Sequence, residues 1–64
     1  MLDKKRYVFT IGKVYIGSIY SFETVQVVAS NEKSALNIAT NYLLPNHLQT
    51  LTIINKTERK LYEN

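Results

Sequence analysis

Residues 28–45 read VASNEKSALNIATNYLLP and join a predicted strand to a predicted amphipathic helix. Asn31 stands where a helix N-cap belongs, because its side chain can accept hydrogen bonds from the exposed amides of a first helical turn. Pro45 disfavours helical geometry at the residue before it, so we expect the helix to cover Glu32–Leu44. The apolar residues inside these bounds follow the 3.6-residue period of one helical stripe, which predicts a helix that covers one face of a sheet. They are Ala35, Leu36, Ile38, Ala39, Tyr42 and Leu43.

The chain before this joint is rich in the β-branched and aromatic residues that suit a pleated sheet. Its composition favours one strand over Arg6–Ile16, a turn near Gly17–Ser21 and a second strand over Phe22–Ala29. Two sequential strands joined by a short turn pair antiparallel. The alternative is a three-stranded meander that turns first at Gly12-Lys13 and again near Ser21.

The chain after the helix predicts one further strand over Leu48–Asn55. Asn55–Glu58 then reads as a turn, and Arg59–Tyr62 is either a short final strand or a frayed tail. The element order is therefore β-β-α-β, with or without a last strand. This order is typical of a small two-layer α+β domain in which one helix packs on an antiparallel sheet. We expect a single domain over the whole chain, with residues 1–5 frayed and residues 57–64 forming the short strand or tail.

The length and composition limit how such a domain can be stabilised. A chain of 64 residues buries only about 60% of the surface that its unfolded state exposes. The sequence has no cysteine and one histidine, His47, so we expect neither disulfides nor a metal or other cofactor. Self-association or binding to a partner is the remaining way to bury more surface, and a homodimer is the expected state.

The same composition favours a cytoplasmic protein, because small secreted domains are commonly disulfide-dense. The longest uncharged run, Val14–Phe22, has nine residues, far fewer than the roughly 20 that span a bilayer. We therefore expect no membrane association.

The residues that could carry chemistry give no support for an enzyme. His47 is the one side chain whose ordinary titration range lies near neutral pH, and it sits in a predicted loop just after a proline. Gly12 and Gly17 have the spacing of a phosphate-binding loop, but Ser18 follows where lysine is required. A domain of this size has little room for a ligand cavity. We expect a non-catalytic protein without a small-molecule substrate.

Both faces of the predicted strands carry apolar side chains, although one helix can cover only one face. A large exposed apolar patch commonly marks an interaction site. Ala29 directly precedes the helix and should point inward, which would place Val25 and Val27 inside and Val28 outside. We predict a protein-binding module that forms a homodimer through its sheet or docks on a host protein. The predicted contact residues are Tyr7, Phe9, Tyr15 and Val28.

Nucleic-acid binding is the alternative function. Basic residues interleave with the sheet aromatics, as they do in proteins that stack unpaired bases and track phosphates. The net charge of +3 and the isoelectric point near 9.3 fit this function, but the charge is small for a protein that neutralises roughly six to ten phosphates. Protein binding is therefore favoured. The residues predicted for the alternative are Lys4, Lys5, Arg6 and Lys13.

Residues 28–36, VASNEKSAL, resemble the strand-cap-helix joint of many short proteins of bacteriophages and mobile elements. The resemblance covers nine residues and follows from helix capping and helix burial, so it implies local structure and no function. The most concrete form of the protein-binding hypothesis is a small phage-type accessory or inhibitor protein that covers part of a host macromolecule.

Overall fold

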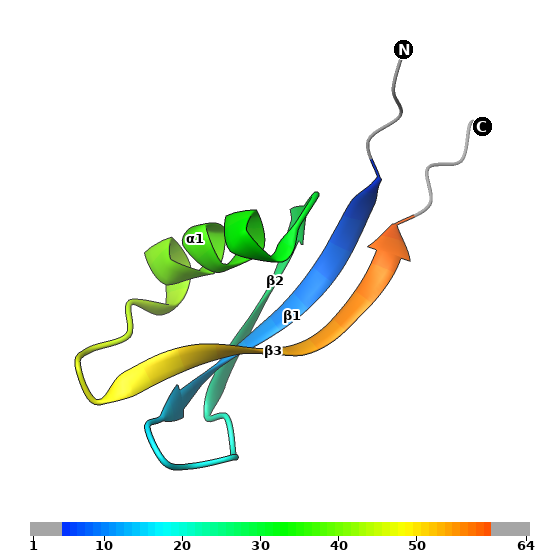
Figure 1. Cartoon of the computed structure of the whole chain (residues 1–64). Helices are drawn as coiled ribbons and strands as arrows, with labels where there is room; N and C mark the ends of the chain where they lie inside the picture. The colour runs from blue at the N-terminus through cyan, green and yellow to red at the C-terminus, as the bar shows by residue number, and fades with distance from the viewer. Residues whose placement is uncertain (1–4, 60–64) are drawn as a thin grey trace.

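The computed structural model describes residues 5–59, which fold into three strands and one helix (Figure 1). The sheet has the order β2-β1-β3, and β1 is antiparallel to both neighbours. This arrangement is the predicted α+β architecture, with one helix packed on one antiparallel sheet. The elements, in chain order, are β1 (Arg6–Tyr15), β2 (Glu23–Ala29), α1 (Glu32–Leu43) and β3 (Gln49–Arg59).

β1 runs through Gly12 without turning, so the two-strand prediction for the first half of the chain is confirmed and the meander is wrong. Gly12 pairs with Thr24 of β2 and with Thr52 of β3. A Cβ placed on this glycine would lie 2.7 Å from Ile54 Cδ1 and 2.7 Å from Ser21 Cβ. Glycine inside a strand is typical of such a close approach, because a side chain would collide with its neighbours.

α1 begins and ends through specific backbone contacts. The Ser34 amide donates to Asn31 Oδ1 over 2.8 Å, which confirms the predicted N-cap. The helix ends at Leu43, one residue before the predicted end, because Leu44 adopts the left-handed conformation with φ of 49°. The Leu44 amide still donates to the Thr40 carbonyl over 3.1 Å, so the chain leaves the helix with that carbonyl satisfied.

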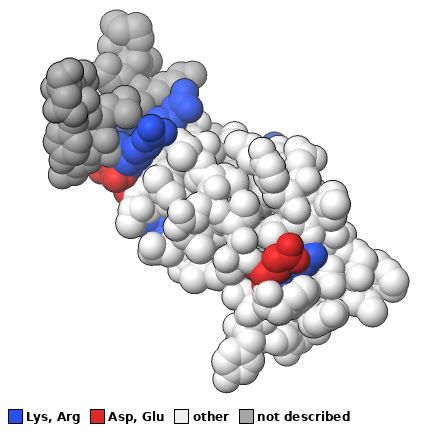
Figure 2. All heavy atoms as spheres, turned by 180° about the vertical axis from the view of Figure 1, so that it is seen from behind, with Lys and Arg blue, Asp and Glu red and all other residues white. Residues whose placement is uncertain are grey.

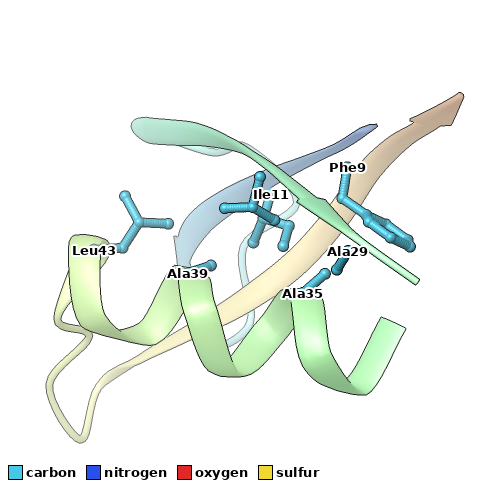
Figure 3. Packing of buried hydrophobic residues seen from close by; sticks show 7 residues of the cluster. Phe9, Ile11, Ala29, Ala35, Ala39 and Leu43 are labelled. Carbon is cyan, nitrogen blue, oxygen red and sulfur yellow. The ribbon is translucent and has the colours of Figure 1, made fainter. Parts of the chain in front are cut away.

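The hydrophobic core lies between α1 and the sheet (Figure 3). α1 packs mainly against β2 and less against β1 and β3. The prediction for β2 is confirmed, because Val27 and Ala29 are buried, Val25 packs partly buried against the core, and Val28 is exposed. The buried residues of this core are Phe9, Ile11, Val27, Ala29, Ala35, Ala39 and Leu43.

β3 is longer than predicted, and the turn expected at Asn55–Glu58 is wrong. β3 continues as far as Arg59, in register with the first half of β1. The register shifts once, because Ile11 pairs with Ile53 while Thr10 pairs with Asn55, leaving one extra residue in β3. With this bulge, a segment of turn-like composition stays paired with β1 as part of the sheet. Of the predicted final strand or tail, residues 57–59 belong to β3, and residues 60–64 lie outside the described residues.

Candidate interaction surfaces

We call the sheet face opposite α1 the open face. It is mainly polar, so the prediction of a large apolar patch on this face is wrong. Side chains alternate along a strand, and the register places the partners of Thr10 and Gly12 on this face. A few apolar side chains also lie on this face: Val14 is buried, Val8 is partly buried, Val28 is 36% exposed, and Ile54, the bulged residue beside Gly12, is 51% exposed. Antiparallel sheets with one covered face commonly alternate in this way. The polar residues of the open face are Thr10, Thr24, Gln26, Thr50, Thr52, Asn55 and Thr57.

The predicted contact residues do not form one surface. Phe9 is fully buried in the core, so it has no surface to offer a partner and its predicted contact role is withdrawn. Tyr7 is partly buried and packs edge-on against Phe9, with ring centroids 6.1 Å apart. Val28 pairs with Val8 on the open face. Tyr15, which is 51% exposed, lies at the other end of the sheet beside Gln49.

The largest apolar exposure is at the end of the sheet where β1 finishes and where β2 and β3 begin. Tyr15 stacks on Phe22 with ring centroids 4.9 Å apart. The Ile16 amide donates to the Leu48 carbonyl over 2.9 Å, which joins this loop to the start of β3. Ile19 is 85% exposed at the loop between β1 and β2. We call this surface the apolar tip; it consists of Tyr15, Ile16, Ile19, Tyr20, Phe22 and Leu48.

Sequence reasoning missed most of the apolar tip, although a signal was present. The longest uncharged run of the chain spans residues 14–22 and has Gly17 and Ser18 near its middle. Turns are normally built from polar residues, glycine and proline. Isoleucine and tyrosine on both sides of such a turn have no core to enter, and their exposure could have been predicted from that conflict.

Lys13 belongs to the base of the apolar tip and not to a cluster with Lys5 and Arg6. Its Nζ donates to the Leu43 carbonyl over 2.6 Å and lies 3.0 Å from Glu23 Oε1. The Lys13 side chain is only 11% exposed, and its Nζ lies 5.5 Å from the centroid of the Phe22 ring. These contacts connect β1, β2 and the end of α1. The structure therefore separates Lys13 from Lys5 and Arg6, two of the other residues predicted for nucleic-acid binding.

A basic surface forms at the opposite end of the sheet, where β1 begins and β3 ends. Arg6 lies directly opposite Arg59 in the β1–β3 ladder. Lys56 Nζ lies 4.4 Å from the centroid of the Tyr7 ring. Figure 2 shows basic groups with an acidic group beside them at one end of the described surface, and a second acidic group next to a basic one toward the opposite end. We call the set Lys5, Arg6, Lys56 and Arg59 the basic end.

The predicted basic set and the observed one differ in membership. Lys5 and Arg6 belong to the basic end, and Lys4 lies outside the described residues. Lys56 and Arg59 were missed, because the sequence predicted a turn at that point and no pairing with β1. A longer predicted β3 in antiparallel register would have placed Arg59 opposite Arg6 and Lys56 opposite Phe9.

Other site types have no counterpart within residues 5–59. His47 is exposed in the turn before β3, and the described part of the chain contains no group of three metal-ligating side chains. No pocket forms among these residues. α1 lacks the length and apolar content of a membrane-crossing helix, and the described residues contain no other helix. Comparisons of the chain with protein-family models, with curated proteins and with solved structures find no match.

Proposed function

We propose that the domain is a non-catalytic protein-binding module that self-associates through the apolar tip. The observation that supports this proposal is that six large apolar side chains at one end of the sheet are each 50% exposed or more. Exposed apolar patches of this kind mark interaction sites on most soluble proteins. Tyrosine and phenylalanine are also enriched at protein interfaces, where a rigid ring offers a large contact area.

The size of the apolar tip fits one side of a dimer interface. The six side chains are on average about two-thirds exposed, and a large apolar side chain offers roughly 200 Å². Together they present on the order of 800 Å², which is about what each partner buries in an interface of standard size. A smaller patch would suit a weak encounter, whereas this one can support a stable pair.

The charge distribution favours a second copy of the chain as the occupant. Lys13 and Glu23, the charged groups beside the apolar tip, form an ion pair and sum to zero. The basic end lies toward the other end of β1. At roughly 3.3 Å per residue, Lys56, opposite Phe9, is about 20 Å from Tyr15, and Arg6 is about 30 Å from it. Two tips can therefore meet with little repulsion, since the Debye length at physiological salt is about 8 Å.

Mass in solution across a dilution series tests this proposal. Light scattering is expected to show a dimer that dissociates on dilution. Ile19→Asp should shift the protein to monomer, because the dimer interface would bury a carboxylate that has no cation to pair with. Ile19 is 85% exposed, so its replacement should leave the thermal unfolding of the monomer unchanged.

A matched control is Val28→Thr, which removes apolar character from the exposed residue on the open face and should leave the dimer intact. A monodisperse monomer at all concentrations would refute self-association and direct the search to a different protein partner. A dimer unaffected by Ile19→Asp would refute the apolar tip as the contact surface.

A further inference from the structure

The basic end holds two like charges that face each other across a strand pair. Arg6 and Arg59 are direct partners in the β1–β3 register. Within residues 5–59, neither guanidinium lies within 4 Å of a carboxylate. Like charges directly opposite each other destabilise an antiparallel pair. An anion bound between these two side chains would remove that repulsion.

The neighbouring residues extend this positive surface to the other face of the sheet. Lys56 lies over the Tyr7 ring, and Lys5 Nζ lies 3.8 Å from Glu58 Oε2 in an exposed, weak ion pair. Four basic residues and Glu58 give the basic end a formal charge of +3. The charged residues elsewhere in 5–59 cancel, so the net charge of the described chain is concentrated here. They are Lys13, Lys33, Glu23 and Glu32.

We infer that the basic end binds the phosphate backbone of single-stranded nucleic acid. Arginine pairs bind phosphate through paired N–H donors, which makes the Arg6–Arg59 pair the centre of the site. Thr57 and Asn55 lie next along β3 on the same face and offer polar groups to the sugar and the bases. Four cations, three of them on adjacent strands and one on the residue before β1, suit a short stretch of a flexible single strand.

The arrangement disfavours an anionic membrane as the ligand. Proteins that lie on a membrane surface combine basic and apolar groups on one face, so that both engage the bilayer together. Here the apolar tip and the basic end are at opposite ends of β1. The inference goes beyond self-association and does not depend on it, because no residue is shared between the two surfaces.

Fluorescence anisotropy with a labelled twelve-residue oligothymidylate at 50, 100 and 200 mM salt tests the inference. The logarithm of the affinity should fall with the logarithm of the salt concentration with a slope of about −0.7 per phosphate neutralised. Three to four contacts give a slope of about −2 to −3, or a loss of roughly 20- to 50-fold between 50 and 200 mM salt.

Arg59→Gln should weaken binding and reduce the slope by about 0.7, and Arg6→Gln with Arg59→Gln by about 1.4. Arg59→Gln removes the repulsion between the two like charges, so the Tm of this variant should not be lower than that of the parent protein. Lys33→Gln is the matched control, since it removes one charge from the exposed first turn of α1. It should leave both the affinity and the slope within error.

Three results would overturn the inference. The first is an absence of binding at 50 mM salt. The second is an equal loss of affinity in Lys33→Gln and Arg59→Gln, which would show attraction to the overall charge and no site. The third is binding to vesicles that contain phosphatidylserine, without binding to the oligonucleotide, which would identify a lipid surface as the ligand.

Discussion

Replacing Lys13 by methionine should destabilise the domain far more than the loss of an ordinary surface lysine. Lys13 Nζ donates to the Leu43 carbonyl over 2.6 Å, at the end of α1. The last turn of α1 contains no basic residue of its own. A cation near a helix C-terminus stabilises the exposed carbonyls and the negative end of the helix dipole. In this fold that cation comes from the central strand of the sheet.

The magnitude follows from the contacts that are lost. A hydrogen bond from a charged donor contributes about 1.5–3 kcal/mol. The Glu23 side chain is 51% exposed, so the 3.0 Å ion pair with Lys13 contributes at most about 1 kcal/mol. Methionine keeps an apolar stem of similar length but leaves the Leu43 carbonyl without this donor. We expect a loss of about 2–3 kcal/mol, which corresponds to a fall in Tm of roughly 10–20 °C for a domain of this size.

Thermal and urea unfolding followed by circular dichroism provide the assay. Lys33→Met is the matched control, because Lys33 is exposed on the same helix, and it should change the unfolding free energy by less than about 0.5 kcal/mol. Glu23→Gln separates the two contacts of Lys13 and should cost less than about 1 kcal/mol. Equal stability of Lys13→Met and Lys33→Met would refute the capping argument. A cost for Glu23→Gln as large as that of Lys13→Met would assign the effect to the ion pair.

Three further substitutions test the core, the close packing around Gly12 and the N-cap of the helix. Phe9→Ala should cost about 3–5 kcal/mol and unfold most of the protein at 25 °C, because Phe9 is fully buried. Phe9→Leu should retain the fold, as measured by near-UV and far-UV circular dichroism. Gly12→Ala should cost about 1–3 kcal/mol in urea unfolding, because its Cβ would lie 2.7 Å from Ile54 Cδ1, and Ile54→Val in the same chain should recover part of that loss. Asn31→Ala should cost about 1 kcal/mol through loss of the 2.8 Å bond from the Ser34 amide, whereas Asn31→Asp should cost little; equal losses would contradict the cap.

Local sequence predicts α1 and its cap well because the forces involved act within a few residues. The bond between the Ser34 amide and Asn31 spans three residues, and the helical stripe repeats within two turns. Pro45 predicts the end of the helix to within one residue. The direction of Val27 and Val28 also follows locally, because alternation along β2 is fixed once Ala29 meets the helix.

Long-range pairing explains what the sequence did not predict. Residues 55–58 have turn-like composition, yet they remain in β3 because β1 offers a ladder from Arg6 to Thr10. The basic end depends on this pairing, since Arg6 and Arg59 are 53 positions apart and become neighbours only across it. The open face is polar for a related reason. α1 covers the side of the sheet that carries Phe9, and the residues that alternate with the buried ones along the strands, many of them threonine, point to the opposite side.

The separation of the two surfaces along β1 decides how they can act together. The basic end and the apolar tip lie about 20–30 Å apart, at roughly 3.3 Å per residue of strand. Charges at the two surfaces therefore interact weakly, across more than two Debye lengths. A nucleic acid at the basic end would therefore change the free energy of association at the apolar tip very little through charge alone. Two tips in contact also place the basic ends at opposite poles of the pair. A dimer of this kind carries two independent positive sites that face away from each other, so it can hold two separate strands or two distant parts of one strand.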